Sequence, residues 1–399
     1  MADTQKTRVA VLFGGRSTEH EISIITGLQV LDAFDSSKYE TIPVYVDPDG
    51  DWYIGDALRK RENYLLSDET KKQLLQVQLT ANVGSELIEV NPPKGLFSRK
   101  DPQRIEVDVF FPAFHGSYGE DGCIQGVLEF IDAAYTCSGP RASSVGMSKH
   151  TTKQLLSARG IPVLPDILLE HRFWNPNEAH LTVQMIQEKL QLPLIVKPNN
   201  LGSSIAVSAA HEEQQLMVSL AGAFAFDHQV LVEPLLQDMY ELNISVLYGK
   251  PVETSVIERP RSEESLLTFE QKYMKGNKKV SGGSSSQGMA SLQRDIDPAD
   301  VPQSVKQEVK DYAQRAFRAL DCRGLVRFDF MVEQVSNKVY FNEVNVLPGS
   351  FSYYLWEKSE PRHSFTELLD ILVQQAQEDW KLKRTIRRRV ESRVLRRSS

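Results

Sequence analysis

Two segments in the last third of the chain, residues 325–332 and 338–346, constrain its fold more than any other feature. In both segments apolar and polar side chains alternate, as in a β-strand whose successive residues point to opposite faces of a sheet. Ser336-Asn337 lies between them and is typical of a turn. The two segments are therefore predicted to form an antiparallel hairpin.

The position of this turn also predicts which residues face one another across the hairpin. A turn centred on 336–337 pairs Asp329 with Glu343 and Arg327 with Asn345, all on one face. Like charges directly opposite each other destabilise a sheet unless something neutralises them. Two carboxylates and an amide oxygen suit a hard cation such as Mg²⁺, so a metal site is inferred here. The alternative is a solvated strand face that carries charges without binding a metal.

The composition indicates a globular protein of two or three domains, given 399 residues of which 41% are hydrophobic. No apolar run approaches the roughly 20 residues that a transmembrane helix needs. The chain begins with a short polar stretch that leads straight into a strand pattern, so no signal peptide is expected. The three cysteines form no CxxC pair, which argues against a disulfide scaffold or a cysteine-built zinc site and favours a cytoplasmic protein.

The net charge of −7 is unevenly distributed along the chain. Residues 381–399 carry nine basic residues and one Glu, a charge of +8, which leaves −15 for the rest. An acidic body argues against a nucleic-acid-binding core. In the tail, Leu382, Ile386, Val390 and Val394 recur every four residues. This spacing suits a basic amphipathic helix that contacts a membrane, RNA or a partner, although a solvated or frayed terminus is the commoner explanation.

The first 140 residues alternate between strand-like and helix-like segments. Apolar runs at 8–13, 41–46 and 107–112 predict buried strands, and the spacing of apolar residues over 124–131 predicts a helix. This alternation indicates an α/β domain with a parallel sheet. Glycine-containing loops follow the first and third strands, at the edge where such sheets bind ligands.

The rest of the chain predicts a mixed middle part and an antiparallel end. Residues 282–288, Gly-Gly-Ser-Ser-Ser-Gln-Gly, form either a lid over a substrate or an ordinary loop. The expected elements are helices near 148–158 and 212–223, and strands at 194–197, 205–207, 229–233, 241–248 and 252–258, in addition to the hairpin.

Three single residues suit ligand chemistry but also have ordinary structural explanations. Lys197 ends an apolar strand before the loop 199–204, where a lysine and backbone N–H groups can bind phosphate, yet an exposed lysine before a turn is common. Glu19 is expected in the first turn of a helix, where the helix dipole favours a carboxylate with or without a ligand. His115 lies in a loop at the ligand-facing edge of the sheet, and a lone histidine is usually structural.

A series of short motifs runs in order along residues 8–375. The motifs are Val9–Ser23, His115–Gly122, Ile124–Gly126, Ser138-Gly139, Met147–Lys149, Val196–Pro198, Gly202–Ser204, Lys272-Tyr273, Arg327–Asp329, Asn342–Asn345 and Pro348-Gly349. Together they resemble the D-alanine–D-alanine ligases of the ATP-grasp superfamily. The resemblance implies an α/β and α+β fold with three domains and a tail. These are a Rossmann-like parallel-sheet domain (1–141), a central ATP-grasp domain (142–232), a C-terminal ATP-grasp domain with the metal site (233–376) and the basic tail (377–399).

The resemblance also implies roles for individual residues, with ATP, two Mg²⁺ ions (or Mn²⁺) and a homodimer. Glu19 would orient the first D-amino acid near His115, with Ser203 and Tyr273 as hydrogen-bonded partners of Glu19. Arg327 and the backbone of Gly349 would stabilise an oxyanion. Asp329, Glu343 and Asn345 would hold the metal ions. The residues implied for the nucleotide are Lys149, Lys197, Ser204, Glu233, Leu236 and Glu241.

The chain departs from the family's pattern after Pro348-Gly349, where the family places a serine on the carboxylate of the second substrate. Ser350, Ser352 and Tyr354 are the candidates for that role. The expected activity is ATP-dependent synthesis of D-alanyl-D-alanine through an acyl phosphate, for peptidoglycan precursors. The alternatives are D-serine, D-lactate or another amino acid as second substrate, or a regulatory nucleotide-binding protein that no longer ligates. A nicotinamide dehydrogenase is disfavoured because Gly14-Gly15 lacks the GxGxxG fingerprint.

Overall fold

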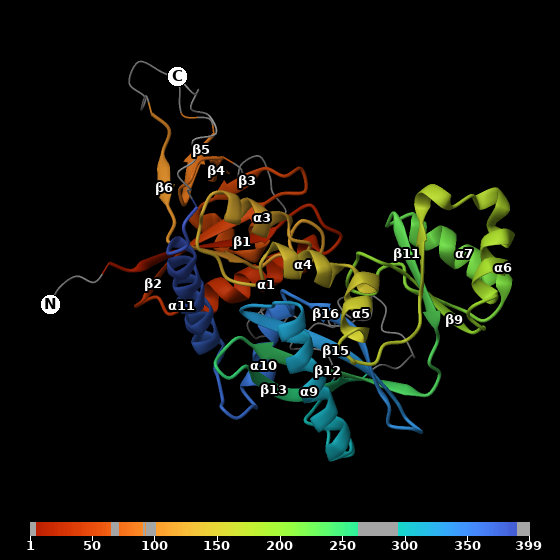
Figure 1. Ribbon diagram of the computed structural model, residues 1–399. Helices are drawn as coiled ribbons and strands as arrows, with labels where there is room; N and C mark the ends of the chain where they lie inside the picture. Colours follow the sequence, from red (N-terminus) through yellow and green to blue (C-terminus); the bar gives the residue numbers. More distant parts are fainter. Residues whose placement is uncertain (1–4, 65–71, 91, 93–100, 262–293, 389–399) are drawn as a thin grey trace, which may run out of the picture.

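The computed structural model describes residues 5–64, 72–90, 92, 101–261 and 294–388, and their strands form three sheets (Figure 1). Within these ranges every helix is too short or too polar to span a bilayer. Tyr273, the predicted lid at 282–288 and residues 389–399 of the tail lie outside the described residues.

The first sheet has parallel strands at one end, as predicted, and is extended on the other side by antiparallel strands that the sequence did not reveal. Its order is β6-β5-β4-β3-β2-β1-β7, and β1 runs parallel to both β2 and β7. The added strands are three to five residues long, too short for a period to be recognised. The strands are β1 (Thr7–Gly14), β2 (Tyr39–Val46), β3 (Trp52–Ile54), β4 (Leu75–Leu79), β5 (Glu86–Glu89), β6 (Arg104–Glu106) and β7 (Val109–Pro112).

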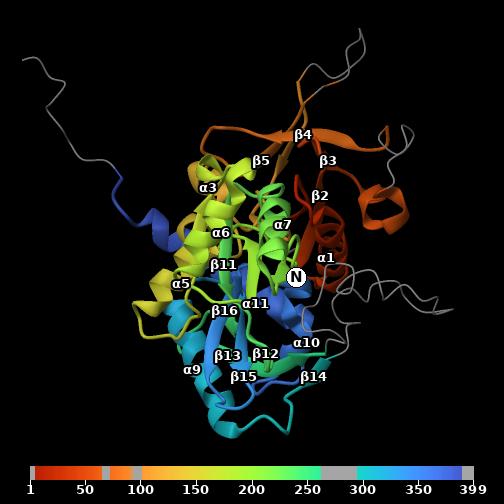
Figure 2. The same ribbon diagram turned by 90° about the vertical axis from the view of Figure 1, so that its right-hand side faces the viewer.

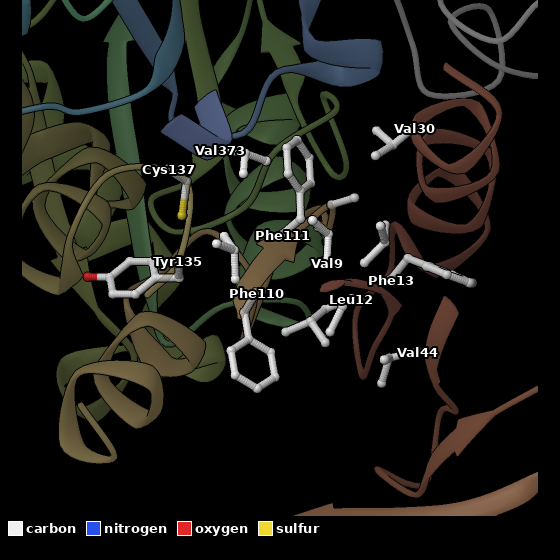
Figure 3. Close-up of a cluster of buried hydrophobic side chains, with 14 of the residues drawn as sticks. Val9, Leu12, Phe13, Val30, Val44, Phe110, Phe111, Tyr135, Cys137 and Val373 are labelled. Carbon is white, nitrogen blue, oxygen red and sulfur yellow. The ribbon is translucent and has the colours of Figure 1, made fainter. Parts of the chain in front are cut away.

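Helices from both ends of the chain pack against this sheet. The helices that share its apolar core include α1 (His20–Ala33), α3 (Cys123–Phe130) and α11 (Phe365–Arg384). Figure 3 shows Val373 of α11 beside Phe111 of β7, close to Val9 of β1. All three side chains are fully buried or nearly so. The last helix of the described residues is therefore part of the core of the first sheet.

The middle sheet is antiparallel, with the order β10-β9-β11-β8. One of its strands lies later than predicted, at 208–210 rather than 205–207, because Ser203, Ser204 and Ala206 adopt left-handed φ angles of 53°, 56° and 55°. Figure 2 shows two helices covering this sheet. The elements are β8 (Ile167–Glu170), α6 (Ala179–Gln187), β9 (Leu194–Pro198), β10 (Ser208–Ala210), α7 (Glu213–Phe224) and β11 (Gln229–Pro234).

The third sheet, of order β14-β13-β12-β15-β16, contains the predicted hairpin. Arg327 pairs with Asn345 and Asp329 with Glu343, so the predicted register is confirmed, although a bulge that was not predicted follows Asp329. The helix α9 packs against one face of the sheet. The elements are β12 (Met239–Leu247), β13 (Glu253–Pro260), β14 (Arg294–Ile296), α9 (Gln303–Ala319), β15 (Leu325–Glu333), β16 (Val339–Asn345) and α10 (Tyr353–Trp356).

Two helices before the middle sheet, α4 (Pro140–Met147) and α5 (Lys149–Ser157), pack against β16 of the third sheet. Ala142 and Leu156 from these helices share the core of that sheet with Val344.

The division into domains at 141/142, 232/233 and 376/377 stays a prediction. The short 3₁₀ helices are η1 (Asp56–Arg59), η2 (Arg61–Tyr64), η3 (His171–Phe173), η4 (Pro176–Glu178) and η7 (Gly349–Ser352).

Candidate active site

One cavity receives residues from all three sheets. Its wall includes the turn before α1, the loop after β7, the loop after β9 and parts of β12 to β16. Because the polar loops of separate sheets meet here, residues far apart in sequence are brought together. The cavity is lined by these sequence-predicted residues: Glu19, His115, Lys149, Lys197, Ser203, Ser204, Glu233, Leu236, Glu241, Arg327, Asp329, Glu343, Asn345 and Gly349.

Glu19 directly precedes α1 without capping the helix through its side chain, and only 5% of its surface is exposed. Ser203, from the loop after β9, donates a hydrogen bond through Oγ to Glu19 Oε1. A Cβ atom at Gly116 would lie 2.7 Å from Glu19 Oε2, and one at Gly202 would lie 3.0 Å from it. The two glycines let both loops approach the carboxylate closely. The result is a fixed anionic group that suits an ammonium ligand.

His115 is buried beside Glu19's loop and contacts Thr26, with 2.8 Å between Nε2 and Thr26 Oγ1. Burial, followed by the nearby Arg327, lowers the pKa of His115 to about 4. The imidazole is therefore neutral at pH 7. It can share a hydrogen bond with a substrate but adds no positive charge to the cavity.

Glu120, in the same loop as His115, lines the cavity but had no role assigned from the sequence. Its Oε2 accepts a hydrogen bond from the Gly116 N–H (2.8 Å), and its Oε1 accepts one from the Leu347 N–H (3.2 Å). Burial, followed by the charge of Glu19, raises the pKa of Glu120 to about 8. Glu120 thus joins the loop of the first sheet to the segment that leads to Gly349. In the sequence, the only indication of a role for Glu120 was its position in the loop that follows a predicted strand.

The two lysines expected to bind phosphate are buried in the cavity wall. Lys149 Nζ donates to the Leu201 carbonyl and lies 3.6 Å from Glu343 Oε2. Lys197 Nζ donates to Asn342 Oδ1 over 3.3 Å. Cations with little access to water attract a polyanion more strongly than surface lysines do. Both side chains line the same cavity.

Glu233 lies between two buried lysines. Its Oε2 is 2.6 Å from Lys197 Nζ, and Lys153 Nζ donates to Oε1 while lying 3.2 Å from Asp166 Oδ2. Burial alone would raise the pKa of Glu233, but Lys197 and Lys153 outweigh it and lower the pKa. The contact with Lys197 has the distance of an ion pair. The sequence analysis did not identify Lys153 as a partner of Glu233. The available indication was that Lys153 lies one helical turn after Lys149.

The predicted metal ligands adjoin these lysines. Arg327 donates to Asp329 through Nε (2.7 Å) and Nη2 (2.8 Å), and Asn345 Nδ2 lies 3.0 Å from Asp329 Oδ2. The described residues hold no group of three or more His, Cys, Asp or Glu suited to a metal. Mg²⁺ needs only one or two protein carboxylates when phosphate oxygens and water complete its ligands. Asp329, Glu343 and Asn345 therefore fit Mg²⁺ that is bound together with a nucleotide.

Arg327 is buried at the end of the cavity that holds Gly349 and His115. Burial lowers the pKa of Arg327, but Asp329, with further contributions from Tyr354 and Glu258, raises it well above the ordinary value. The guanidinium is thus a permanent cation. It can stabilise negative charge that develops on an oxygen beside it.

The segment after Gly349 places its serines outside the cavity. Ser350, Phe351 and Ser352 have left-handed φ angles of 49°, 51° and 47°. Ser350 Oγ donates to Gln29 Oε1 (2.6 Å), and Ser352 is fully buried, with no partner for its hydroxyl among the described residues. Neither serine belongs to the cavity wall. This backbone turns both side chains toward α1 and the core.

A cluster that the sequence analysis missed lies at the same end of the cavity. Arg294 and Glu258 line the cavity, and Arg294 Nη1 is 2.7 Å from Glu258 Oε2. The Tyr354 hydroxyl donates to Glu258 Oε1 (3.0 Å), and the Arg294 guanidinium lies 4.1 Å from the centre of the Tyr354 ring. These residues are far apart in the sequence and form no local motif, so nothing in the sequence indicated that they meet.

Comparisons with known proteins agree with this geometry. A family model described as "D-ala D-ala ligase N-terminus" matches residues 8–138, and one described as "D-ala D-ala ligase C-terminus" matches residues 155–374. A D-alanine–D-alanine ligase of Thermosipho africanus is 36% identical over 378 residues, which cover 94% of this chain and 95% of the relative. One from Staphylococcus epidermidis is 32% identical and covers 95% of this chain and 97% of the relative.

Solved structures with the same fold cover the chain almost completely. The D-alanine–D-alanine ligase from Coxiella burnetii superimposes with a TM-score of 0.74 at 26% identity, over 95% of this chain and 98% of that one. The VanG D-Ala:D-Ser ligase from Enterococcus faecalis also gives a TM-score of 0.74, at 25% identity, over 93% of this chain and 100% of that one. The similarity therefore extends across all three sheets.

Proposed function

Because this chain belongs to the D-alanine–D-alanine ligase family, which has the ATP-grasp fold, we propose that it uses ATP to join two D-alanine molecules for peptidoglycan precursors. The observation that carries this proposal is the meeting of three groups in one cavity. They are the Glu19–Ser203 pair, the two buried lysines, and the two-carboxylate cluster beside Arg327. Each group suits a different part of the ligation.

In the first step, the carboxylate of the first D-alanine attacks the γ-phosphorus of ATP, and ADP leaves. Glu19 binds the ammonium of this substrate and so orients its carboxylate. Lys149 and Lys197 reduce the repulsion between that carboxylate and the phosphates. Glu233, which lines the same cavity, would accept a hydrogen bond from the exocyclic amine of the adenine. The product is D-alanyl phosphate, which must be protected from water.

Asp329, Glu343 and Asn345 are the residues that would hold Mg²⁺, as two ions, with Mn²⁺ as a substitute. A bound divalent ion would neutralise charge on the phosphate oxygens. Ser204, Leu236 and Glu241 complete the proposed nucleotide site.

In the second step, the free amine of the second substrate attacks the acyl carbon, and phosphate leaves after a tetrahedral intermediate. The oxygen of that intermediate carries negative charge. Arg327 and the backbone N–H of Gly349 would stabilise it, and both residues line the cavity together with the neutral His115. Tyr273 is proposed as a second partner of Glu19.

The test is ADP release by purified protein with Mg-ATP, with and without D-alanine, with products identified by mass. D-alanine-dependent ADP together with D-alanyl-D-alanine supports the proposal. Nucleotide binding without ADP release would instead favour a regulatory protein that no longer ligates.

A second candidate keeps the chemistry but changes the acceptor to D-serine. The similarity to a D-Ala:D-Ser ligase and the unusual segment after Gly349 favour testing it. The same assay with D-alanine and D-serine together distinguishes the two, because the mixed dipeptide has a different mass.

We further propose a cytoplasmic homodimer. The cytoplasm supplies ATP, and all three cysteines are free thiols, one of them exposed, as a reducing compartment would keep them. Sedimentation of the purified protein tests the oligomeric state.

A further inference from the structure

We propose that Lys153 is a positioning residue that holds Glu233 as an ionised hydrogen-bond acceptor and thereby restricts the nucleotide to purines that carry an amine at carbon 6. This inference rests on the nucleotide site proposed above and deepens it. Lys153 itself is not among the described residues that line the cavity, so it acts on the nucleotide only through Glu233.

Lys153 approaches Glu233 from a different part of the fold. It lies on α5, whereas Glu233 lies on β11 of the middle sheet. Asp166 directly precedes β8, and Ile167 of β8 pairs with Val232 of β11, so Asp166 adjoins Glu233 across the sheet. The helix therefore places one lysine against two carboxylates that adjacent strands bring together.

All three side chains of this cluster are buried. The exposed fraction of the side chain is 2% for Lys153, 2% for Glu233 and 9% for Asp166. Lys153 Nζ donates to Glu233 Oε1 and lies 3.2 Å from Asp166 Oδ2. Asp166 Oδ1 is 2.7 Å from Nδ1 of His150. Because a buried charge without a partner is costly, rotation of any of these side chains away from the cluster is strongly disfavoured.

Glu233 has a second cationic neighbour, but that neighbour also serves the phosphates. Lys197 Nζ lies 2.6 Å from Glu233 Oε2 and donates to Asn342 Oδ1. Lys197 lines the cavity and is proposed to bind phosphate, so a bound nucleotide divides its charge between two anions. Lys153 does not belong to the cavity wall in the described part of the chain. Its charge therefore stays with Glu233 and Asp166 whether or not a nucleotide is bound.

The charge of Glu233 decides which base it accepts. Burial alone raises the pKa of Glu233, but Lys197 and Lys153 outweigh burial and lower it, so the carboxylate is ionised. An ionised carboxylate only accepts hydrogen bonds, whereas a protonated one can also donate. Glu233 in this state binds the amine of adenine and repels the carbonyl oxygen that hypoxanthine and guanine carry at carbon 6. Without Lys153, this discrimination would depend on a lysine that the phosphates also attract.

The test compares the binding of two nucleotides that share the ribose and the triphosphate. ATP carries an amine at carbon 6 of the base, and ITP carries a carbonyl oxygen there. The dissociation constants of Mg-ATP and Mg-ITP are measured by calorimetric titration without D-alanine, so that no acyl phosphate forms. The proteins are the wild type, Lys153→Met and the control Lys306→Met.

Lys306 is a matched control for the loss of a buried lysine. It lies on the helix α9, is buried, and pairs with Asp297 at 2.7 Å. It is not among the described residues that line the cavity. Lys306→Met therefore removes a helical lysine and its ion pair without touching Glu233.

We expect the wild type to bind Mg-ATP roughly 10- to 100-fold more tightly than Mg-ITP, the value of a hydrogen bond to a charged group. In Lys153→Met, Mg-ATP binding should weaken by a similar factor while Mg-ITP binding changes little, so the preference for ATP largely disappears. The KM for D-alanine at saturating Mg-ATP should not change. Lys306→Met should keep the preference of the wild type. A merely structural role of Lys153 would weaken both nucleotides together and leave their ratio unchanged.

A double variant covers the case in which Lys153→Met fails to fold because two buried carboxylates lose their lysine. Lys153→Met combined with Asp166→Asn removes one charge of each sign and so preserves the net charge of the cluster. It should show the same loss of preference. Asp166→Asn alone leaves the contact between Lys153 and Glu233 in place and should keep the preference of the wild type.

An unchanged ratio of the two dissociation constants in Lys153→Met or in the double variant would overturn the inference. Loss of the preference in Lys306→Met would overturn it as well, because the ratio would then follow stability alone. Equal binding of ATP and ITP by the wild type would also refute it, while dipeptide formation from ATP would still support the proposed function. Absence of both nucleotide binding and ADP release in the wild type would contradict the proposed function itself, and the inference with it.

Discussion

The side chain of Glu19 lies against two glycines, and this close approach gives a direct test of the first substrate site. Gly116→Ala would place a Cβ 2.3 Å from Ser17 Oγ and 2.7 Å from Glu19 Oε2, at a φ of +72° that alanine rarely adopts. We expect it to raise the KM for the first D-alanine and to destabilise the fold by about 1–3 kcal/mol. Gly126→Ala is the control, since its Cβ would meet nothing within 4 Å. An unchanged KM in Gly116→Ala would count against the Glu19 site.

Glu343 provides a test of the metal ligands. Glu343→Gln removes one negative charge from the cluster while keeping the shape of the side chain. We expect turnover to be lost and the unfolding temperature to stay close to that of the wild type. The measurement is Mg-dependent ADP release alongside thermal unfolding. Near-normal ADP release would rule out Glu343 as a metal ligand.

His115 predicts a pH dependence of stability. Burial lowers its pKa from 6.5 to about 4, so the folded protein resists protonation that the unfolded chain accepts. The stability from neutral His115 is complete above pH 6.5 and is lost as the pH falls toward 4, by about 3 kcal/mol at most. Urea unfolding at pH 7 and pH 4.5 should show that His115→Gln reduces this dependence. An equal dependence in both proteins would contradict the assignment.

At the scale of single elements, the sequence predicted those strands and helices that are long enough to show a clear hydrophobic period. The hairpin of β15 and β16 was predicted with its register because alternation over eight residues and a central turn leave few other pairings. The bulge after Asp329 was not predicted, because one extra residue in a strand does not produce a recognisable change in the alternation of apolar and polar residues. The short strands β3 to β6 lacked the length for a recognisable period. The shift of β10 results from left-handed serines, which sequence alone does not indicate.

The last helix offers a test of element stability. Ser364 and Glu367 form a capping box at the start of α11, each accepting a hydrogen bond from the backbone N–H of the other. Ser364→Ala should lower the free energy of unfolding by about 1 kcal/mol, and Ser364→Asp should not, because Asp keeps the acceptor. Chemical denaturation measures both. Equal stability of all three proteins would show that the cap contributes nothing.

At the scale of the whole molecule, the chain's two ends depend on each other. α11 packs in the core of the first sheet, whereas Lys383 in its last turn pairs with Glu129, and Arg388 beyond the helix pairs with Asp132. Such exposed pairs contribute about 0–1 kcal/mol each. A protein that ends at Trp380 should therefore keep its kcat and KM values, while one that ends at Ser364 should not fold. Loss of activity on removing only 381–399 would assign the tail a catalytic role.

The candidate site could be predicted only in part, because only residues that are close in the sequence could be related to one another. Residues within one motif or one hairpin, such as Asp329 and Glu343, could be assigned because sequence neighbours fix their geometry. The cluster of Glu258, Arg294 and Tyr354 could not, because its members meet only after two strands and a helical segment have packed. Contacts of this kind depend on the packed sheets and on no local pattern.

The central claim is that the carboxylate of D-alanine attacks ATP directly. The most direct test supplies the protein with Mg-ATP and D-alanine labelled with ¹⁸O in its carboxylate, and measures the phosphate by mass. Attack by the carboxylate requires that one labelled oxygen leave with the phosphate when the dipeptide forms, so we expect one ¹⁸O per phosphate and an equal amount of D-alanyl-D-alanine. Unlabelled phosphate, or ADP released without any dipeptide, would contradict the account.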